Sequence, residues 1–167
     1  MVQLQFCMEL LKQLKHRGIH TAIDTNGYVP WKTLEGITKW ADLFLYDMKC
    51  YDQQLHRRLT GVNNVRIKSN LRRLLMKGTP LIIRIPLIPG CNDRPAEMEG
   101  IAKIIREGKD STTVHLLPYH QFAEQKYGRV GREYRLKGLK PPSPRNLRKL
   151  GRIFESRDIP VVIMGTL

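Results

Sequence analysis

Short apolar runs alternate with amphipathic helical patterns along this chain, and the alternation limits the folds open to it. The apolar runs cover residues 21–24, 43–48, 81–88, 113–117 and 160–164. Between them, apolar residues recur at three- and four-residue intervals, the spacing of one helix face. Strands separated by helices predict an α/β fold with a mostly parallel sheet. Because the runs are almost continuously apolar, we expect both faces of the strands to be buried.

Polar residues stand at or near the end of successive predicted strands. Asp47 and Lys49 close the second run, and residues two apart on a strand share one face of the sheet. The others are Asp24 and Thr25 after the first run, Arg84 within the third and His120 after the fourth. Polar residues at strand after strand favour a partial barrel over a doubly wound sheet with one switch point. Five strands are fewer than the about eight of a small closed barrel, so we expect an open sheet without its first part.

Length and charge restrict the class of protein further. The 167 residues fit a single domain, and no apolar run approaches the roughly 18 residues of a membrane span. We therefore predict a cytoplasmic protein without a membrane partner. The net charge of +14 is compatible with an anionic partner, but the basic residues are spread along helices and aromatic residues are few. Solvated helix faces are the simpler interpretation, with a nucleic-acid binding module as an alternative based on charge alone.

Six short segments, in order, carry a resemblance to a known family. They are Asp24-Thr25-Asn26-Gly27, Tyr46-Asp47-Met48-Lys49, Thr60-Gly61-Val62-Asn63-Asn64, Arg84-Ile85-Pro86-Leu87-Ile88-Pro89-Gly90, Leu116-Leu117-Pro118-Tyr119-His120 and Gly138-Leu139-Lys140-Pro141-Pro142. The chain resembles the glycyl-radical enzyme activating enzymes, of the pyruvate formate-lyase activating type, over nearly its whole length. The resemblance implies a radical S-adenosylmethionine reaction on a partial (β/α)6 barrel. In this family a [4Fe-4S] cluster held by three cysteines reduces S-adenosylmethionine, and the resulting radical takes hydrogen from a glycine loop of a partner enzyme.

Two signatures of that family are absent from the sequence. The cluster spacing CxxxCxxC does not occur, since Cys7, Cys50 and Cys91 are far apart, and these three also form no disulfide framework. The glycine-rich GGEP segment is missing as well. We therefore expect residues 1–167 to be the C-terminal part of such an enzyme, without the first two strands. We expect that part to be inactive by itself and to bind no cluster.

The resemblance also implies roles for individual residues. Asp47 and Lys49 would lie near the ribose and carboxylate of S-adenosylmethionine, and Arg84 would contact the cofactor or the incoming peptide. His120 would approach the ribose side. Asp24, Thr25 and Asp47 would match positions that hold a monovalent cation, for which oxygen ligands are suitable.

Other interpretations of the same residues stay open. Asp47 and Lys49 could simply pair with each other, and Arg84 is costly in a buried strand unless it is paired or meets a ligand. Lys49 could also be a Schiff-base lysine in an aldolase-like barrel, with Asp47 as its acid–base partner. His120 alone would be a surface or capping residue, and Asn26-Gly27 is a strong turn signal. A sheet without its first strands would expose an edge beside residues 21–24, through which the chain could self-associate.

Overall fold

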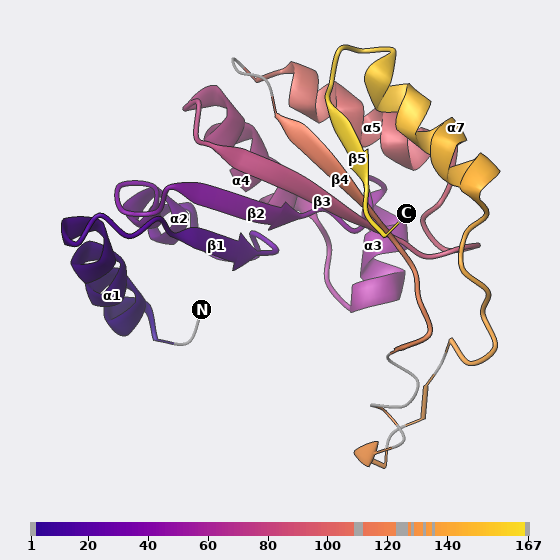
Figure 1. Cartoon of the computed structure of the whole chain (residues 1–167), viewed down its shortest axis with the longest axis horizontal. Helices are drawn as coiled ribbons and strands as arrows, with labels where there is room; N and C mark the ends of the chain where they lie inside the picture. The colour runs from indigo at the N-terminus through magenta and orange to yellow at the C-terminus, as the bar shows by residue number, and fades with distance from the viewer. Residues whose placement is uncertain are drawn as a thin grey trace.

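The computed structural model describes residues 3–108, 112–122, 127, 129–131, 133–134 and 136–165, which contain one five-stranded sheet. The strands are β1 (Ala22–Thr25), β2 (Leu43–Asp47), β3 (Leu81–Leu87), β4 (Thr113–Pro118) and β5 (Val161–Ile163). They are all parallel and lie in the order β1-β2-β3-β4-β5, so neighbours in the chain are neighbours in the sheet. The predicted parallel α/β fold is confirmed, and the sheet is open instead of closed into a barrel (Figure 1).

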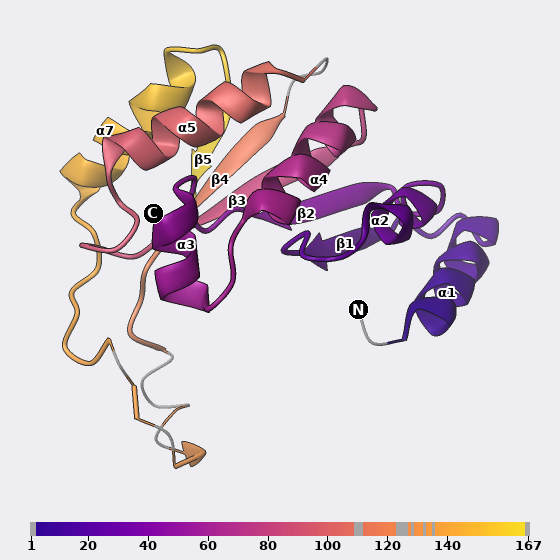
Figure 2. The same cartoon turned by 180° about the vertical axis from the view of Figure 1, so that it is seen from behind.

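One helix precedes the first strand, the others connect the strands, and the helices cover one face of the sheet. They are α1 (Leu4–His16), α2 (Trp31–Ile37), α3 (Gln53–Thr60), α4 (Val65–Met76), α5 (Pro95–Arg106) and α7 (Pro144–Glu155). Figure 2 shows α2, α4 and α5 in front of the sheet, while Figure 1 shows the opposite face with the strands in open view. The stretch at residues 121–142, predicted as a surface excursion, lies partly outside the described residues.

Alternate residues of the central strands face these two environments. Phe44 and Tyr46 in β2, and Ile83 and Ile85 in β3, are fully buried under the helices. The residues between them are only half-buried, and β4 repeats the pattern. The prediction of burial on both faces was therefore wrong, because helices cover only one side. A run of apolar residues does not reveal which face lacks a covering helix.

Several helix boundaries follow from local chemistry that the sequence shows directly. The Leu55 N–H donates to Asp52 Oδ1 at the start of α3, and that helix ends at Gly61 with a φ of 82°. Ser143 caps α7 by accepting from the Asn146 N–H, with Pro144 in the first turn. No helix among the described residues is long and apolar enough to cross a membrane.

Candidate functional site

A cluster of two acids and one arginine lies across β1, β2 and β3 on the helix-free face. Arg84 Nε lies 2.8 Å from Asp47 Oδ1, and Arg84 Nη2 lies 2.7 Å from the same oxygen. Arg84 Nη2 also lies 2.5 Å from Asp24 Oδ1. One guanidinium therefore joins the carboxylates of the two preceding strands. We call Asp24, Asp47 and Arg84 the ion cluster.

Strand register brings the ion cluster together. Asp47 of β2 is paired directly with Arg84 of β3, while Asp24 of β1 is paired with Leu45, two residues before Asp47. All three side chains thus point to the same face. Partial burial alone lowers the pKa of Arg84, but its hydrogen bonds to the two carboxylates outweigh that effect. The pKa of Arg84 is therefore raised above its ordinary value, and the guanidinium stays charged.

His115 extends the same row and was missed as a site candidate from sequence. It is paired in register with Arg84 and is half-buried on the helix-free face. The signal was available in the alternation of β4, because His115 stands between Val114 and Leu116, both buried on the helix side. The row thus presents an acid, a guanidinium and an imidazole on three neighbouring strands.

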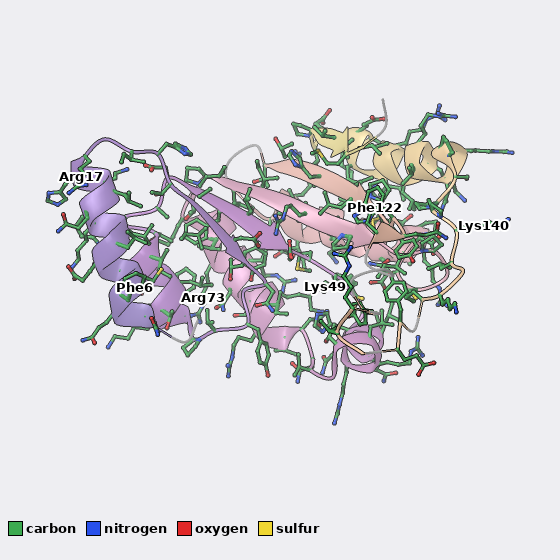
Figure 3. The ribbon with its side chains drawn as sticks, turned by 60° about the horizontal axis from the view of Figure 1, so that its bottom comes forward. Phe6, Arg17, Lys49, Arg73, Phe122 and Lys140 are labelled. Carbon is green, nitrogen blue, oxygen red and sulfur yellow. The ribbon has the colours of Figure 1, made fainter. Side chains whose placement is uncertain are left out.

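Lys49 lies exposed just beyond the end of β2 (Figure 3). No ion pair joins it to Asp47 among the described residues, because Asp47 pairs with Arg84. The alternative of an Asp47–Lys49 pair is therefore wrong. The ammonium group is left available to a ligand, and Asp47 is not placed as its acid–base partner.

Three buried polar side chains hold the main chain around Lys49. Asn92 Nδ2 donates to the carbonyl oxygens of Lys49 and Pro86, at 2.6 Å each. Glu97 accepts from the N–H groups of Tyr51 and Asp52, at 2.5 and 3.2 Å. We call Asn64, Asn92 and Glu97, all less than a tenth exposed, the polar clamp.

Asn64 completes the polar clamp from the loop before α4. Its Nδ2 donates to the carbonyls of Cys50 and Tyr51, at 2.9 and 3.0 Å. Lys68 Nζ adds a bond of 3.0 Å to the Tyr51 carbonyl. Segment 49–52 is thus held through its backbone from several directions. Sequence reasoning did not identify this role, since only the fold shows which main-chain groups need partners.

The remaining predicted residues lie in different surroundings. Thr25 Oγ1 accepts a hydrogen bond from the Gly27 N–H at 3.0 Å. Because successive side chains of a strand point to opposite faces of the sheet, Thr25 does not share the face of Asp24. Within the described ranges, no group of three or more His, Cys, Asp and Glu residues could hold a metal ion. The monovalent cation site stays a prediction.

His120 lies exposed beyond β4, with its ring against that of Phe122 at a centroid distance of 4.7 Å and an interplanar angle of 41°. It lines an apolar cavity of about 570 Å³ together with Pro141, Leu147 and Met164. No hydrogen bond or ion pair among the described residues joins His120 to the ion cluster. Its cofactor role stays a prediction.

Comparison with known proteins gives several related chains, although no family model matches. The trans-4-hydroxy-L-proline dehydratase activating enzyme of Clostridioides difficile is 37% identical over 97% of this chain and 54% of its own length. The pyruvate formate-lyase 1-activating enzyme of Escherichia coli K12 is 30% identical over 92% of this chain and 63% of its own. A crystal structure of a domain of pyruvate-formate lyase-activating enzyme from Bacteroides vulgatus superposes with a TM-score of 0.83. It is 25% identical, and the match covers 98% of this chain and 92% of that one.

The chain belongs to the glycyl-radical enzyme activating enzymes. It spans about half the length of the curated activating enzymes it matches first. A radical SAM methyltransferase from Sphaerobacter thermophilus, 16% identical with a TM-score of 0.67 over 88% of this chain, shares the fold. The predicted family and its radical SAM type of sheet are therefore confirmed.

The cysteines of this activating-enzyme chain do not provide a ligand set for a [4Fe-4S] cluster. Cys7 lies on α1, Cys50 follows β2 and Cys91 follows β3, and all three are free thiols. Cys50 is fully buried, and this burial, with the nearby charge of Glu97, raises the pKa of its thiol to about 12. A cluster needs thiolate ligands at close spacing, so these residues do not fit it.

Proposed function

We propose that residues 1–167 form the C-terminal part of the catalytic barrel of a radical S-adenosylmethionine activating enzyme. The observation that carries this proposal is the ion cluster on the helix-free face, at the carboxyl ends of β1 and β2 in a chain of this family. Ligands of open parallel sheets and barrels bind at the carboxyl ends of strands. The helix-free face would be the wall of the cofactor site.

The residues present suit S-adenosylmethionine by their chemistry. The carboxylate of Asp47 would accept from ribose hydroxyls, and the exposed ammonium of Lys49 would pair with the methionine carboxylate. Arg84 would orient Asp47 through its hydrogen bonds and contact the cofactor or the incoming peptide, and His120 would contact the ribose side. When bound, S-adenosylmethionine supplies the hydrogen-abstracting chemistry. Asp24 and Asp47 would add oxygen ligands for a monovalent cation, whereas the Thr25 side chain, on the opposite face of β1, would not join them there.

The proposed substrate is a glycine loop of a partner enzyme. The relatives are named as activating enzymes of a hydroxyproline dehydratase, a choline trimethylamine-lyase and a pyruvate formate-lyase, among others. We propose that this chain likewise serves a glycyl-radical enzyme, such as one of the pyruvate formate-lyase type. By itself it should be inactive, because its cysteines do not fit the cluster.

Reading the DNA in frame upstream of the Met1 codon tests the proposal. We expect an open frame that encodes CxxxCxxC followed by GGEP. In the resulting longer protein, Lys49→Gln should raise the S-adenosylmethionine concentration needed for half-maximal activation. Lys149→Gln, an equal change of charge at an exposed position of α7, should leave it unchanged. A stop codon directly upstream would contradict the proposal, as would equal effects of the two substitutions.

A further inference from the structure

A groove between α2 and α4 brings together basic and aromatic side chains that are far apart in sequence. It has a volume of about 520 Å³, and its lining includes Tyr28, Trp31, Asn63, Arg66, Ser69 and Arg73. Its lining residues come from α2, α4 and the segments before them, and Figure 2 shows α2 and α4 in front of the sheet, on the side away from the helix-free face. We call it the arginine groove.

Each arginine of the groove lies over an aromatic ring. Arg66 Cζ lies 5.3 Å from the ring centroid of Tyr28, and Arg73 Cζ lies 5.4 Å from that of Trp31. Stacking fixes the plane of a guanidinium while its N–H edges stay free to bind carboxylates or phosphates. Both arginines are exposed, so their donor edges are accessible.

The two arginines also have no acidic partner among the described residues. Two nearby bases differ, since Arg72 of α4 pairs with Glu107 at 2.6 Å and Lys77, directly after α4, pairs with Glu35 at 3.5 Å. The nearby acids are thus committed to other bases. The groove therefore carries two uncompensated positive charges that attract an anion.

Buried hydrogen bonds fix the two walls of the groove relative to each other. Asn70 of α4, 2% exposed, donates from Nδ2 to the carbonyls of Gly27 and Val29, at 2.9 and 2.8 Å. The buried Tyr46 hydroxyl donates to the Ile67 carbonyl of α4 at 2.8 Å. The loop that carries Tyr28 is thus attached to the helix that carries both arginines. A preformed site loses less entropy on binding.

We propose that the arginine groove binds an extended acidic segment of a partner polypeptide. Arg66, Ser69 and Arg73 lie at i, i+3 and i+7, so the backbone positions of the two arginines are about 10 Å apart along the helix. Acidic side chains three residues apart on a polyproline II segment are about 9 Å apart and share one side. Such a segment would place one carboxylate on each arginine, with its backbone beside Ser69. The groove would act independently of cofactor binding on the other face of the sheet.

Fluorescence anisotropy with labelled peptides tests the proposal on the chain as it exists. The probe has a Glu-Pro-Pro-Glu core, the control peptide a Gln-Pro-Pro-Gln core, and a short oligo-thymidine tests nucleic acid. We expect saturable binding of the acidic probe only. Arg66→Gln with Arg73→Gln should weaken it by about tenfold, whereas the same charge change through Arg145→Gln with Arg148→Gln on α7 should alter it less than about twofold.

Four results would overturn the proposal. An equal loss of peptide affinity in the α7 control variant would show that the acidic peptide is attracted by the net charge of the protein and not by a specific site. Equal binding of the glutamine peptide would show an apolar contact instead of carboxylate recognition. Tighter binding of oligo-thymidine that depends on Arg66 and Arg73 would assign the groove to nucleic acid. Absence of saturable binding up to about millimolar probe counts equally against it.

Discussion

Arg84 shows how one side chain can stabilise a charged surface inside a sheet. Its guanidinium contacts Asp24 and Asp47, while its own side chain is 20% exposed and that of Asp47 is 22% exposed. Asp24 is 63% exposed and mostly hydrated, so its ion pair with Arg84 contributes less to the stability of the fold. The half-buried Asp47 depends most on Arg84, because an uncompensated carboxylate at that depth is costly.

We predict that Arg84→Met destabilises the fold by roughly 1–3 kcal/mol, because Asp47 loses its charged partner. The Asp47→Asn and Arg84→Met double variant should be more stable than the sum of the single changes indicates. Urea unfolding of the four proteins measures this coupling. Strictly additive losses would mean that the pair contributes nothing to stability.

Asp42 gives a prediction on acid stability at the same scale. Its hydrogen bond from Lys15, together with the Thr21 N–H, lowers the pKa of its carboxyl from 3.8 to about 2. A lowered pKa in the folded state stabilises the protein above the unfolded pKa, and the effect is lost as pH falls through the folded value. Asp42→Asn should therefore lower the free energy of unfolding at pH 6. The difference in stability between the variant and the parent protein should disappear between about pH 4 and pH 2. Thermal unfolding across that range measures it, and a pH-independent difference would contradict the linkage.

At the scale of elements, loops are fixed onto helices by buried polar groups. Asn92, Asn64 and Glu97 bind the backbone of segment 49–52, and Asn70 binds that of residues 27–29. Buried backbone groups without partners are costly, so these side chains determine the loop paths after β1 and β2. Those paths set where Lys49 and Tyr28 lie.

Replacing one residue of the polar clamp should therefore lower the free energy of unfolding more than replacing an exposed asparagine. We expect Asn92→Ala to destabilise by roughly 2–4 kcal/mol, since it leaves the carbonyls of Lys49 and Pro86 and the Ile88 N–H without partners. Asn63→Ala, at an exposed position, should cost less than about 1 kcal/mol. Hydrogen exchange should also show lost protection at Ile88. Equal losses of stability in the two variants would contradict a stabilising role for the polar clamp.

Gly27 provides a second test of loop placement. Its φ is +67°, and a Cβ built there would lie 1.7 Å from the Tyr46 hydroxyl oxygen. Gly61 also has a positive φ, +82°, but a Cβ there would meet nothing within 4 Å. Gly61→Ala should cost about 1 kcal/mol of backbone strain, and Gly27→Ala should cost at least about 2 kcal/mol. Denaturant unfolding compares them, and similar costs would mean that Tyr46 moves aside freely.

The order of elements could be predicted from sequence because it depends on local periodicity and capping. Asp52, Gly61 and Ser143 mark helix boundaries by their own chemistry. The partner of Asp47 could not be predicted in the same way. Arg84 stands 37 positions away, and only the register of β2 on β3 brings the two together. The polar clamp was hidden for the same reason, since its acceptors are main-chain groups of distant segments.

At the scale of the whole molecule, the sheet is covered on one side only and ends in two edge strands. β1 and β5 each have one neighbour, and the helix-free face carries half-buried apolar residues such as Leu45 and Ile82. Unpaired strand edges and open apolar faces favour association. The net charge of +14 opposes it through repulsion between copies.

The balance predicts self-association that increases with salt. Light scattering after size-exclusion chromatography should show mostly monomer at about 50 mM salt and more dimer at about 500 mM, where repulsion is screened. Ala22→Lys, which adds a charge to the exposed β1 edge, should reduce the dimer fraction. Ala96→Lys, at an exposed position of α5, is the matched control. A monomer under both conditions would contradict the hypothesis.

The polar clamp has one more consequence, for how this part of the protein can diversify. Its three side chains hold segment 49–52 through carbonyl and N–H groups only. The course of the chain past β2 is therefore independent of which amino acid occupies position 49, whose side chain is exposed. Replacing Lys49 would change the chemical group displayed at the rim of the sheet without changing the scaffold beneath it. Position 49 is thus a place where a new ligand preference can be selected at little cost to folding.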